Sequence, residues 1–188
     1  MPTSNLAIWP DILLAIQQVP HQRVLDVGPG HGKAAVLLRE YLAPSPDTID
    51  AVEAWEPYLG RFELECLYDR VYVGDVAADT WELDGRKVTA ASVLDRYDLV
   101  LMGDVIEHIP LGEAMDLLRR IPGRVVVCTP VAFFDNDPMH QHPPTEAHVS
   151  HWTSAEWESI GAVRPVEVCY ENLGGWIVRL GPLQHEDK

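Results

Sequence analysis

Three glycines at alternate positions, Gly28, Gly30 and Gly32, are the clearest chemical feature of the chain. They lie directly after the mainly apolar run 23–27 and directly before a segment with helical spacing. A glycine loop between a strand and a helix lets a ligand approach the backbone closely. We therefore expect a binding site at this loop, and its ligand is the first question.

Phosphate ligands fit the loop poorly. A nucleoside triphosphate loop needs Ser or Thr after Gly-Lys to bind magnesium, but Ala34 follows Lys33 here, which excludes it. A dinucleotide loop has its third glycine at the position of Lys33, and Pro29 removes one backbone N–H. Asp26 also places a carboxylate where a pyrophosphate would lie. The dinucleotide remains as the weaker alternative.

A ligand with positive charge and no phosphate suits these residues better. S-adenosylmethionine carries an ammonium and a sulfonium group, which acidic side chains near the loop attract. The stretch VLDVGPGHG resembles the first motif of class I S-adenosylmethionine-dependent methyltransferases. This resemblance implies that Gly28, Gly30 and Gly32, with Pro29 in the same loop, wrap the methionine part of the cofactor. It implies that Asp26 supports the loop.

Further motifs follow in the order of that family. Glu53 comes 23 residues after Gly30, where the family places an acid on the ribose hydroxyls, and a carboxylate can accept both hydroxyl protons. Asp75, followed by Val76, occupies the position of the adenine contact. The stretch YDLVLMGDVIEHI resembles the fourth motif, in which groups such as Asp104 lie beneath the methyl donor. The alternatives are a solvated acid for Glu53 and an ordinary turn for Asp75.

A histidine-rich segment, residues 131–152, follows the fifth expected strand and contains His140, His142, His148 and His151. The resemblance implies that this loop overhangs the methyl group of the donor, where an acceptor would bind. A histidine there can act as a general base. We therefore expect His148, His108 and Asp104 to form the catalytic set. The alternative is a solvated loop whose histidines only make local hydrogen bonds.

The same region raises the question of a metal. Asp104, Glu107 and His108 form D-x-x-E-H, and His148 precedes Trp152-Thr153 by four residues. This pattern resembles metal-dependent small-RNA 2′-O-methyltransferases and, in part, some quinone-pathway O-methyltransferases. Two carboxylates and two imidazoles can hold a divalent ion. However, those enzymes have Glu at the position of Asp104, and H-x-x-x-W-T also occurs in metal-free relatives. We therefore assign no metal and leave the question open.

Composition limits the partners of the chain. Its 188 residues predict one domain, and 14 basic against 29 acidic side chains leave a net charge of −15. Such a charge argues against nucleic acid and anionic membranes as partners. Three separated cysteines form no disulfide framework, and the two later ones, Cys128 and Cys169, suit buried positions. We find no signal peptide or membrane span and expect a cytoplasmic protein.

Short β-rich runs alternate with helical segments along the chain. Strands are expected at 23–28, 48–54, 70–76, 97–105 and 124–130, with a terminal hairpin within 163–182 and helices at 31–42, 57–67, 112–121 and 154–162. This order predicts an α/β fold: a Rossmann-like three-layer sandwich with a mostly parallel seven-stranded sheet and a C-terminal antiparallel hairpin. Within one domain, 1–188, we expect an N-terminal helix (1–20), a donor-binding core (21–130), the histidine-rich loop (131–152) and the C-terminal helix and hairpin (153–188).

The resulting hypothesis is an S-adenosylmethionine-dependent methyltransferase acting on an oxygen or nitrogen of a small-molecule acceptor. Two alternatives stay open. One is a catalytically inactive protein that binds the donor, since a fold alone does not guarantee activity. The other is a metal-dependent O-methyltransferase using the D-x-x-E-H motif and His148. The identity of the acceptor and the oligomeric state do not follow from these residues.

Overall fold

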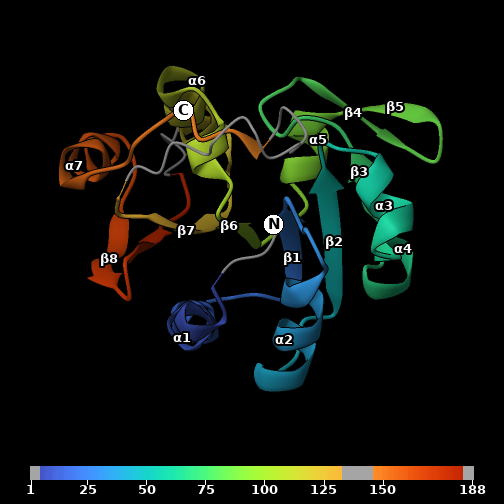
Figure 1. Ribbon diagram of the computed structural model, residues 1–188, viewed down its shortest axis with the longest axis horizontal. Helices are drawn as coiled ribbons and strands as arrows, with labels where there is room; N and C mark the ends of the chain where they lie inside the picture. The colour runs from blue at the N-terminus through green and yellow to red at the C-terminus, as the bar shows by residue number, and fades with distance from the viewer. Residues whose placement is uncertain (1–4, 133–145, 184–188) are drawn as a thin grey trace, which may run out of the picture.

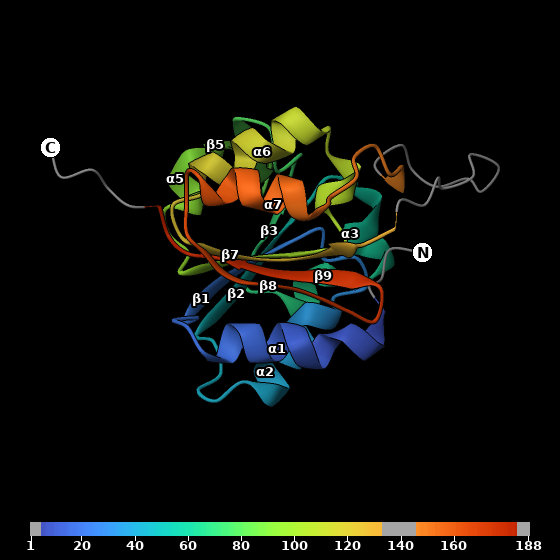
Figure 2. The ribbon, with the colours of Figure 1, turned by 90° about the vertical axis from the view of Figure 1, so that its left-hand side faces the viewer.

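The computed structural model describes residues 5–132 and 146–183. One nine-stranded sheet lies between two layers of helices (Figures 1 and 2). The strands are ordered β5-β4-β3-β2-β1-β6-β7-β9-β8 across the sheet. Their bounds are β1 Arg23–Val27, β2 Thr48–Glu53, β3 Val71–Val73, β4 Thr80–Leu83, β5 Arg86–Thr89, β6 Leu99–Gly103, β7 Arg124–Pro130, β8 Val166–Asn172 and β9 Gly175–Leu180.

The predicted α/β class and Rossmann-like architecture are confirmed. Strands β3, β2, β1, β6 and β7 are parallel neighbours, and β9 pairs antiparallel with both β7 and β8. The terminal hairpin turns at Leu173 and Gly174, which both have positive φ (49° and 81°). A turn with positive φ at both central residues matches the twist of the strands it joins.

Two strands are additional to the seven expected. β4 and β5 form a hairpin that pairs antiparallel with β3 through Val73 and Glu82. Asp84 and Gly85 make its turn, with φ of 50° and 74°. These strands carry mainly exposed polar side chains, so no apolar run marked them, although an Asp-Gly pair is typical of hairpin turns.

The helices divide between the two faces of the sheet (Figure 2). Their bounds are η1 Leu6–Ile8, α1 Trp9–Gln17, α2 Lys33–Tyr41, α3 Pro57–Arg61, α4 Leu64–Leu67, α5 Ala90–Leu94, η2 Ile106–His108, α6 Leu111–Arg120 and α7 Ser154–Gly161. The side chains of α1, α2 and α4 bury one face, and those of α5, α6 and α7 bury the other. None of the described helices has the length and apolar character needed to cross a membrane.

Two local predictions are corrected. The segment 57–67 is not one helix but two, α3 and α4, because Glu63 adopts a left-handed conformation (φ 52°) between them. Helix α7 begins at Ser154 as expected, and its N-cap is Thr153, whose side chain accepts a hydrogen bond from the Ala155 N–H while Glu156 completes a capping box. Of the two later cysteines, Cys128 is buried as expected, but Cys169 is exposed on the edge strand β8.

The middle of the sheet is buried on both faces. In β6, Leu99 and Leu101 pack against the α1–α2 layer, whereas Val100 and Met102 pack against the α5–α6–α7 layer. Alternate side chains of a strand point to opposite faces, so a strand covered on both sides has an unbroken apolar sequence. The polar residues that follow such strands are therefore concentrated at their carboxyl ends.

Candidate functional site

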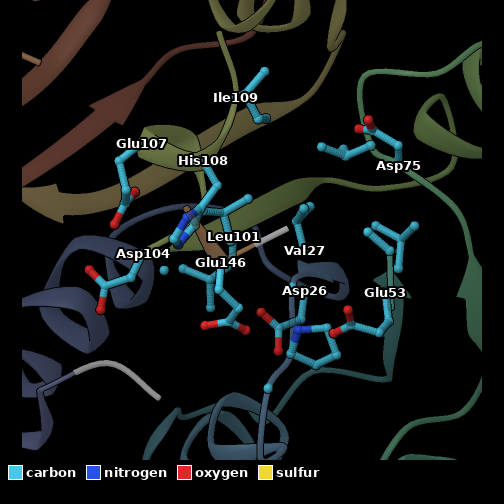
Figure 3. Close-up of a pocket in the computed structure, with 18 of the residues that line it drawn as sticks. Asp26, Val27, Glu53, Asp75, Leu101, Asp104, Glu107, His108, Ile109 and Glu146 are labelled. Carbon is cyan, nitrogen blue, oxygen red and sulfur yellow. The ribbon is translucent and has the colours of Figure 1, made fainter. Parts of the chain in front are cut away.

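A cavity of about 380 Å³ opens at the carboxyl ends of the parallel strands (Figure 3). Its lining includes the loop after β1, the end of β2, the turn after β3 and the segment after β6. The carboxyl ends of parallel strands meet at the same edge of a sheet, which is where open α/β sheets bind ligands. The cavity is thus where the order of strands predicts a site.

The glycine loop forms one wall of this cavity. Gly28, Gly30 and Gly32 have φ of 62°, 53° and 75°, a left-handed conformation that L side chains rarely adopt. A Cβ on Gly28 would lie 2.8 Å from Cγ2 of Val105, and one on Gly32 would clash with Leu67. Gly28, Pro29 and Gly30 line the cavity, whereas Gly32 is the N-cap of α2 and packs beside α4.

Two buried carboxyl groups lie next to the loop. Asp26 is 4% exposed and its Oδ2 accepts a 2.5 Å hydrogen bond from the hydroxyl of Tyr68. Burial raises the pKa of Asp26 to about 7, although the Tyr68 hydrogen bond acts in the opposite direction. Glu53 is 6% exposed, and its Oε1 accepts the backbone N–H of Trp55 at 2.8 Å. Burial also raises the pKa of Glu53 to about 7.

The turn after β3 places Asp75 and Val76 on the wall of the cavity. Asp75 is exposed, and its Oδ1 accepts the backbone N–H of Ala77 at 2.8 Å, so it closes a turn as the simpler interpretation required. Val76 is buried and presents an apolar surface. Both features suit the edge of a binding site, and Figure 3 shows Asp75 and Glu53 on the same side of the cavity.

The segment after β6 supplies the opposite wall. Asp104 has a left-handed backbone (φ 53°), and its N–H donates to the carbonyl of Cys128 at 2.8 Å. A positive φ at a residue other than glycine stores strain and is typical of functional sites. In Figure 3, Asp104, Glu107 and His108 lie together, across the cavity from Glu53 and Asp75.

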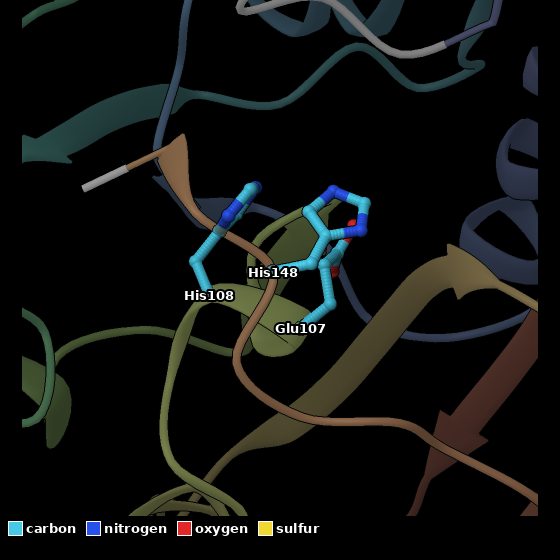
Figure 4. Close-up of side chains that lie close together, drawn as sticks. All are labelled: Glu107, His108 and His148. Carbon is cyan, nitrogen blue, oxygen red and sulfur yellow. The ribbon is translucent and has the colours of Figure 1, made fainter. Parts of the chain in front are cut away.

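Glu107 and His108 meet His148 at this wall (Figure 4). One possible ligand atom from each of the three lies within 4.8 Å of those of the other two. The rings of His108 and His148 meet edge to face, with centroids 4.9 Å apart. Burial raises the pKa of Glu107 to about 8, and the charge of Asp104 adds to this. Burial together with His108 lowers the pKa of His148.

The expected site residues are therefore largely brought together. Those that line the cavity are Asp26, Gly28, Pro29, Gly30, Glu53, Asp75, Val76, Asp104, His108 and His148. Of the other histidines in the expected acceptor loop, His151 is exposed and its Nε2 bonds to the carbonyl of Val131 at 2.8 Å. His140 and His142 lie outside the described residues.

Several lining residues were not predicted. Tyr58 of α3 donates a 3.2 Å hydrogen bond to Oε1 of Glu146, and both residues line the cavity. Trp9 of α1 and Glu113 of α6 contribute from two further helices. No motif marks Tyr58, Trp9 or Glu113, because they reach the cavity through helix packing rather than from a strand end, and Glu146 comes from the segment between β7 and α7. The amphipathic pattern of α1 revealed only that the helix packs on the sheet.

The cavity is strongly acidic. Within the described parts of the chain, 5–132 and 146–183, seven carboxyl side chains line it: Asp26, Glu53, Asp75, Asp104, Glu107, Glu113 and Glu146. Among the described residues that line it, Lys33 is the single lysine or arginine. Such a wall repels phosphate and attracts cationic ligands.

Comparison with known proteins identifies the family. A family model described as a methyltransferase domain matches residues 7–162. The chain belongs to this methyltransferase-domain family. Its first motif, the Gly28–Gly32 loop, and the segment after β6 both fall within the matched region.

Solved structures share the fold at low sequence identity. A candidate O-methyltransferase from Nostoc punctiforme superposes with a TM-score of 0.56 and 19% identity, covering 93% of this chain and 56% of its own. An O-methyltransferase family protein from Burkholderia thailandensis superposes with a TM-score of 0.57 and 12% identity. The match covers 96% of this chain and 57% of that protein. The N-terminal domain of EvdMO1, crystallised in the presence of SAH and D-fucose, superposes with a TM-score of 0.55 and 18% identity. The match covers 95% of this chain and 81% of that domain.

The methyltransferase domain described here thus spans little more than half of the Nostoc and Burkholderia proteins. The likeness to all three structures extends over nearly the whole of this chain and concerns its fold. Among curated proteins, no sequence matches it significantly. The ligand of this domain must therefore be inferred from the residues that line its own cavity.

Proposed function

We propose that this domain is an S-adenosylmethionine-dependent methyltransferase that acts on an oxygen or nitrogen of a small-molecule acceptor. The observation that carries the proposal is the acidic cavity at the strand ends, with a left-handed glycine loop on one wall and the buried Glu53 beside it. Membership of the methyltransferase-domain family and the SAH present with the EvdMO1 domain support the same cofactor.

The residues present fit this cofactor chemically. A sulfonium and an ammonium group are favoured by nearby carboxylates, whereas the pyrophosphate of a dinucleotide is not. Glu53 has one carboxyl oxygen on the N–H of Trp55 and so retains acceptor capacity for ribose hydroxyls. Asp26 lies at the end of β1 directly under the loop, and Asp75 and Val76 offer a polar and an apolar contact for an adenine ring. When bound, this cofactor supplies a methyl group on a positively charged sulfur.

The protein contributes position and proton acceptors. An in-line methyl displacement is accelerated mainly by holding acceptor and donor in the correct geometry. Nδ1 of His108 lies 3.1 Å from the carbonyl of Ala147, which can only accept, so Nδ1 carries the proton and Nε2 has the free lone pair. His148 lies beside it with a lowered pKa and is neutral at pH 7. Either imidazole can take the proton of an acceptor hydroxyl or amine.

Calorimetric titration tests the cofactor. We expect S-adenosylmethionine and S-adenosylhomocysteine to bind and NAD not to bind. Glu53→Ala is expected to weaken binding of the methyl donor by about 1–3 kcal/mol, since the ribose hydroxyls lose a charged partner. Binding of NAD in place of the methyl donor would overturn the proposal.

Turnover separates an enzyme from an inactive binding protein. Formation of S-adenosylhomocysteine is followed with panels of small hydroxyl and amine acceptors, each compared with a reaction that contains no acceptor. Acceptor-dependent formation of the product supports the enzyme. Donor binding without turnover on any acceptor supports the inactive alternative. The net charge of −15 leads us to expect that polyanionic acceptors such as RNA give none.

A further inference from the structure

Trp9 of α1 and Lys33 of α2 lie beside each other in the lining of the acidic cavity. The Nζ of Lys33 is 5.9 Å from the centre of the Trp9 ring. We propose that the ammonium of Lys33 and the indole N–H of Trp9 bind the α-carboxylate of the methyl donor. This inference rests on the proposed function, because it assigns two further residues to the same cofactor and fixes which end of it they hold.

The charges in the cavity leave one place for an anionic group. S-adenosylmethionine carries a carboxylate besides its ammonium and sulfonium, and the carboxyl side chains of the described lining repel a further carboxylate. Lys33 is the single lysine or arginine among these described lining residues, so its ammonium can offset that repulsion. The imidazoles of His108 and His148 must be neutral to accept a proton in the proposed reaction, and a neutral ring supplies no such charge.

The indole N–H of Trp9 is a donor that lacks an acceptor. Trp9 is 4% exposed, and its Nε1 is buried with no hydrogen-bond partner in the described structure. A buried polar group without a partner costs free energy, and most such groups in proteins are paired. Because Trp9 lines the cavity beside Lys33, a carboxylate bound by Lys33 would supply the missing acceptor.

The start of α2 favours an anion at the same place. Lys33 is the first residue of this helix, and Ala34 in the same turn also lines the cavity. The first N–H groups of a helix have no acceptor within it and form the positive end of the helix dipole. The N-cap, Gly32, has no side chain to accept these hydrogen bonds, and the first turn contains no acidic residue. The helix therefore adds to the attraction of Lys33 for a carboxylate.

The surroundings of Lys33 strengthen its interaction with a counter-ion. Its side chain is half-buried, and burial lowers the pKa of the ammonium, although the charge of Asp104 acts in the opposite direction. An ion pair away from bulk water is stronger than one at the surface, because the effective dielectric constant is lower. A carboxylate bound here also sets the direction of the donor. Its methionine end lies at α1 and α2, and its ribose lies at Glu53 at the end of β2.

Calorimetric titration with two ligands tests the inference without turnover. S-adenosylmethionine and decarboxylated S-adenosylmethionine differ only in the carboxylate, and both keep the ammonium and the sulfonium. Lys33→Met is expected to weaken binding of S-adenosylmethionine by about 10- to 100-fold, the effect of losing a hydrogen bond between charged groups. The same variant should bind the decarboxylated ligand equally well or more tightly, because a positive charge has been removed from beside a dication.

Trp9→Phe tests the indole N–H separately. Phenylalanine keeps an aromatic ring at this buried position and removes only the donor. We expect this variant to bind S-adenosylmethionine about 10-fold more weakly, since the carboxylate loses one hydrogen bond, and to bind the decarboxylated ligand with unchanged affinity. Equal affinities of Trp9→Phe and the unchanged chain for S-adenosylmethionine would remove Trp9 from the carboxylate site.

Lys87→Met is the matched control, because Lys87 is exposed on β5, and it should bind both ligands like the unchanged chain. Lys33→Arg keeps the charge and should recover most of the affinity for S-adenosylmethionine. Binding of the decarboxylated ligand shows that each variant is folded. If Lys33→Met weakens both ligands equally, or neither, the carboxylate site is wrong while the proposed cofactor stands. If the unchanged chain binds neither ligand, the proposed function fails, and this inference fails with it.

Discussion

The hydroxyl of Tyr68, directly after α4, donates a 2.5 Å hydrogen bond to Asp26 at the end of β1. Both residues are buried, at 5% and 4% exposure. The bond crosses from the helical layer to the strand that leads into the glycine loop. It therefore links the packing of a short helix to the position of a carboxylate in the cavity.

Tyr68→Phe is expected to destabilise the chain, and more so at higher pH. Asp26 has a pKa of about 7 in the folded state, above its unfolded value, so its contribution to stability falls as pH rises through 7. Losing a bond to the ionised carboxylate costs about 1.5–3 kcal/mol, and losing one to the neutral acid costs about 1. Chemical denaturation at about pH 5 and about pH 8 measures the difference. Tyr41→Phe, at an exposed position, is the control.

Affinity for S-adenosylmethionine is expected to rise with pH between about 6 and 8. Asp26 and Glu53 both have pKa values of about 7, and a cationic ligand binds better to their ionised forms. Binding should therefore release protons below pH 7, which calorimetry detects in buffers of different ionisation enthalpy. Glu53→Gln removes one of the two groups and should reduce the pH dependence. An affinity that is independent of pH in the unchanged chain would contradict this coupling.

Gly32→Ala is expected to destabilise the fold by about 1–3 kcal/mol, because its φ of 75° disfavours a side chain and the added Cβ would clash with Leu67. Gly112→Ala provides the contrast, since Gly112 lies in α6 with open space around it. That substitution should be neutral or stabilise by about 0.4–1 kcal/mol. Thermal unfolding of both variants measures the difference, and equal effects would refute the requirement for glycine at the start of α2.

His148→Ala and His108→Ala are each expected to lower turnover by on the order of 10²-fold, with little change in donor affinity. Both side chains line the cavity, and Figure 3 shows His108 across it from Glu53. His151→Ala should retain turnover, because His151 is exposed and outside the cluster shown in Figure 4. Steady-state kinetics with a fixed acceptor tests this. Full turnover in both cavity variants would make these histidines structural.

Arg164→Met is expected to reduce stability by at least about 3 kcal/mol. The buried guanidinium donates to the carbonyls of Leu118, Ile121, Gly123 and Gly181, which joins the end of α6 to the end of β9. Replacing it leaves several buried carbonyls without donors. Denaturant titration measures the loss, and Arg86→Met on the exposed strand β5 should change stability little. If Arg164→Met leaves the free energy of unfolding unchanged, water replaces the guanidinium as the donor to these carbonyls.

Much of the lining of the cavity was predictable from local sequence. Apolar runs predict the strands β1, β2 and β6. Because these strands are parallel, the residues that follow them lie at the same edge of the sheet, independently of how the helices pack. The strand ends therefore predict a shared sheet edge for Gly28, Glu53 and Asp104, whereas their roles toward a cofactor come from the resemblance to class I methyltransferases. Gly32 shows the limit of such a motif, since its left-handed conformation is local but its neighbour, Leu67 of α4, is 35 positions away.

The alternation of the seven expected strands with helices, the glycine loop and the acid at the end of β2 follow from the sequence by itself, because they depend on local periodicity and on residue types with special backbone freedom. Only the tertiary structure decided that Tyr68 reaches Asp26, that Tyr58 and Glu146 join the cavity, and that His148 meets Glu107 while Asp104 lies outside that cluster. These contacts join residues 41 to 88 positions apart. Such contacts depend on how helices and loops pack over the sheet, and the spacing of residues along the chain does not determine that packing.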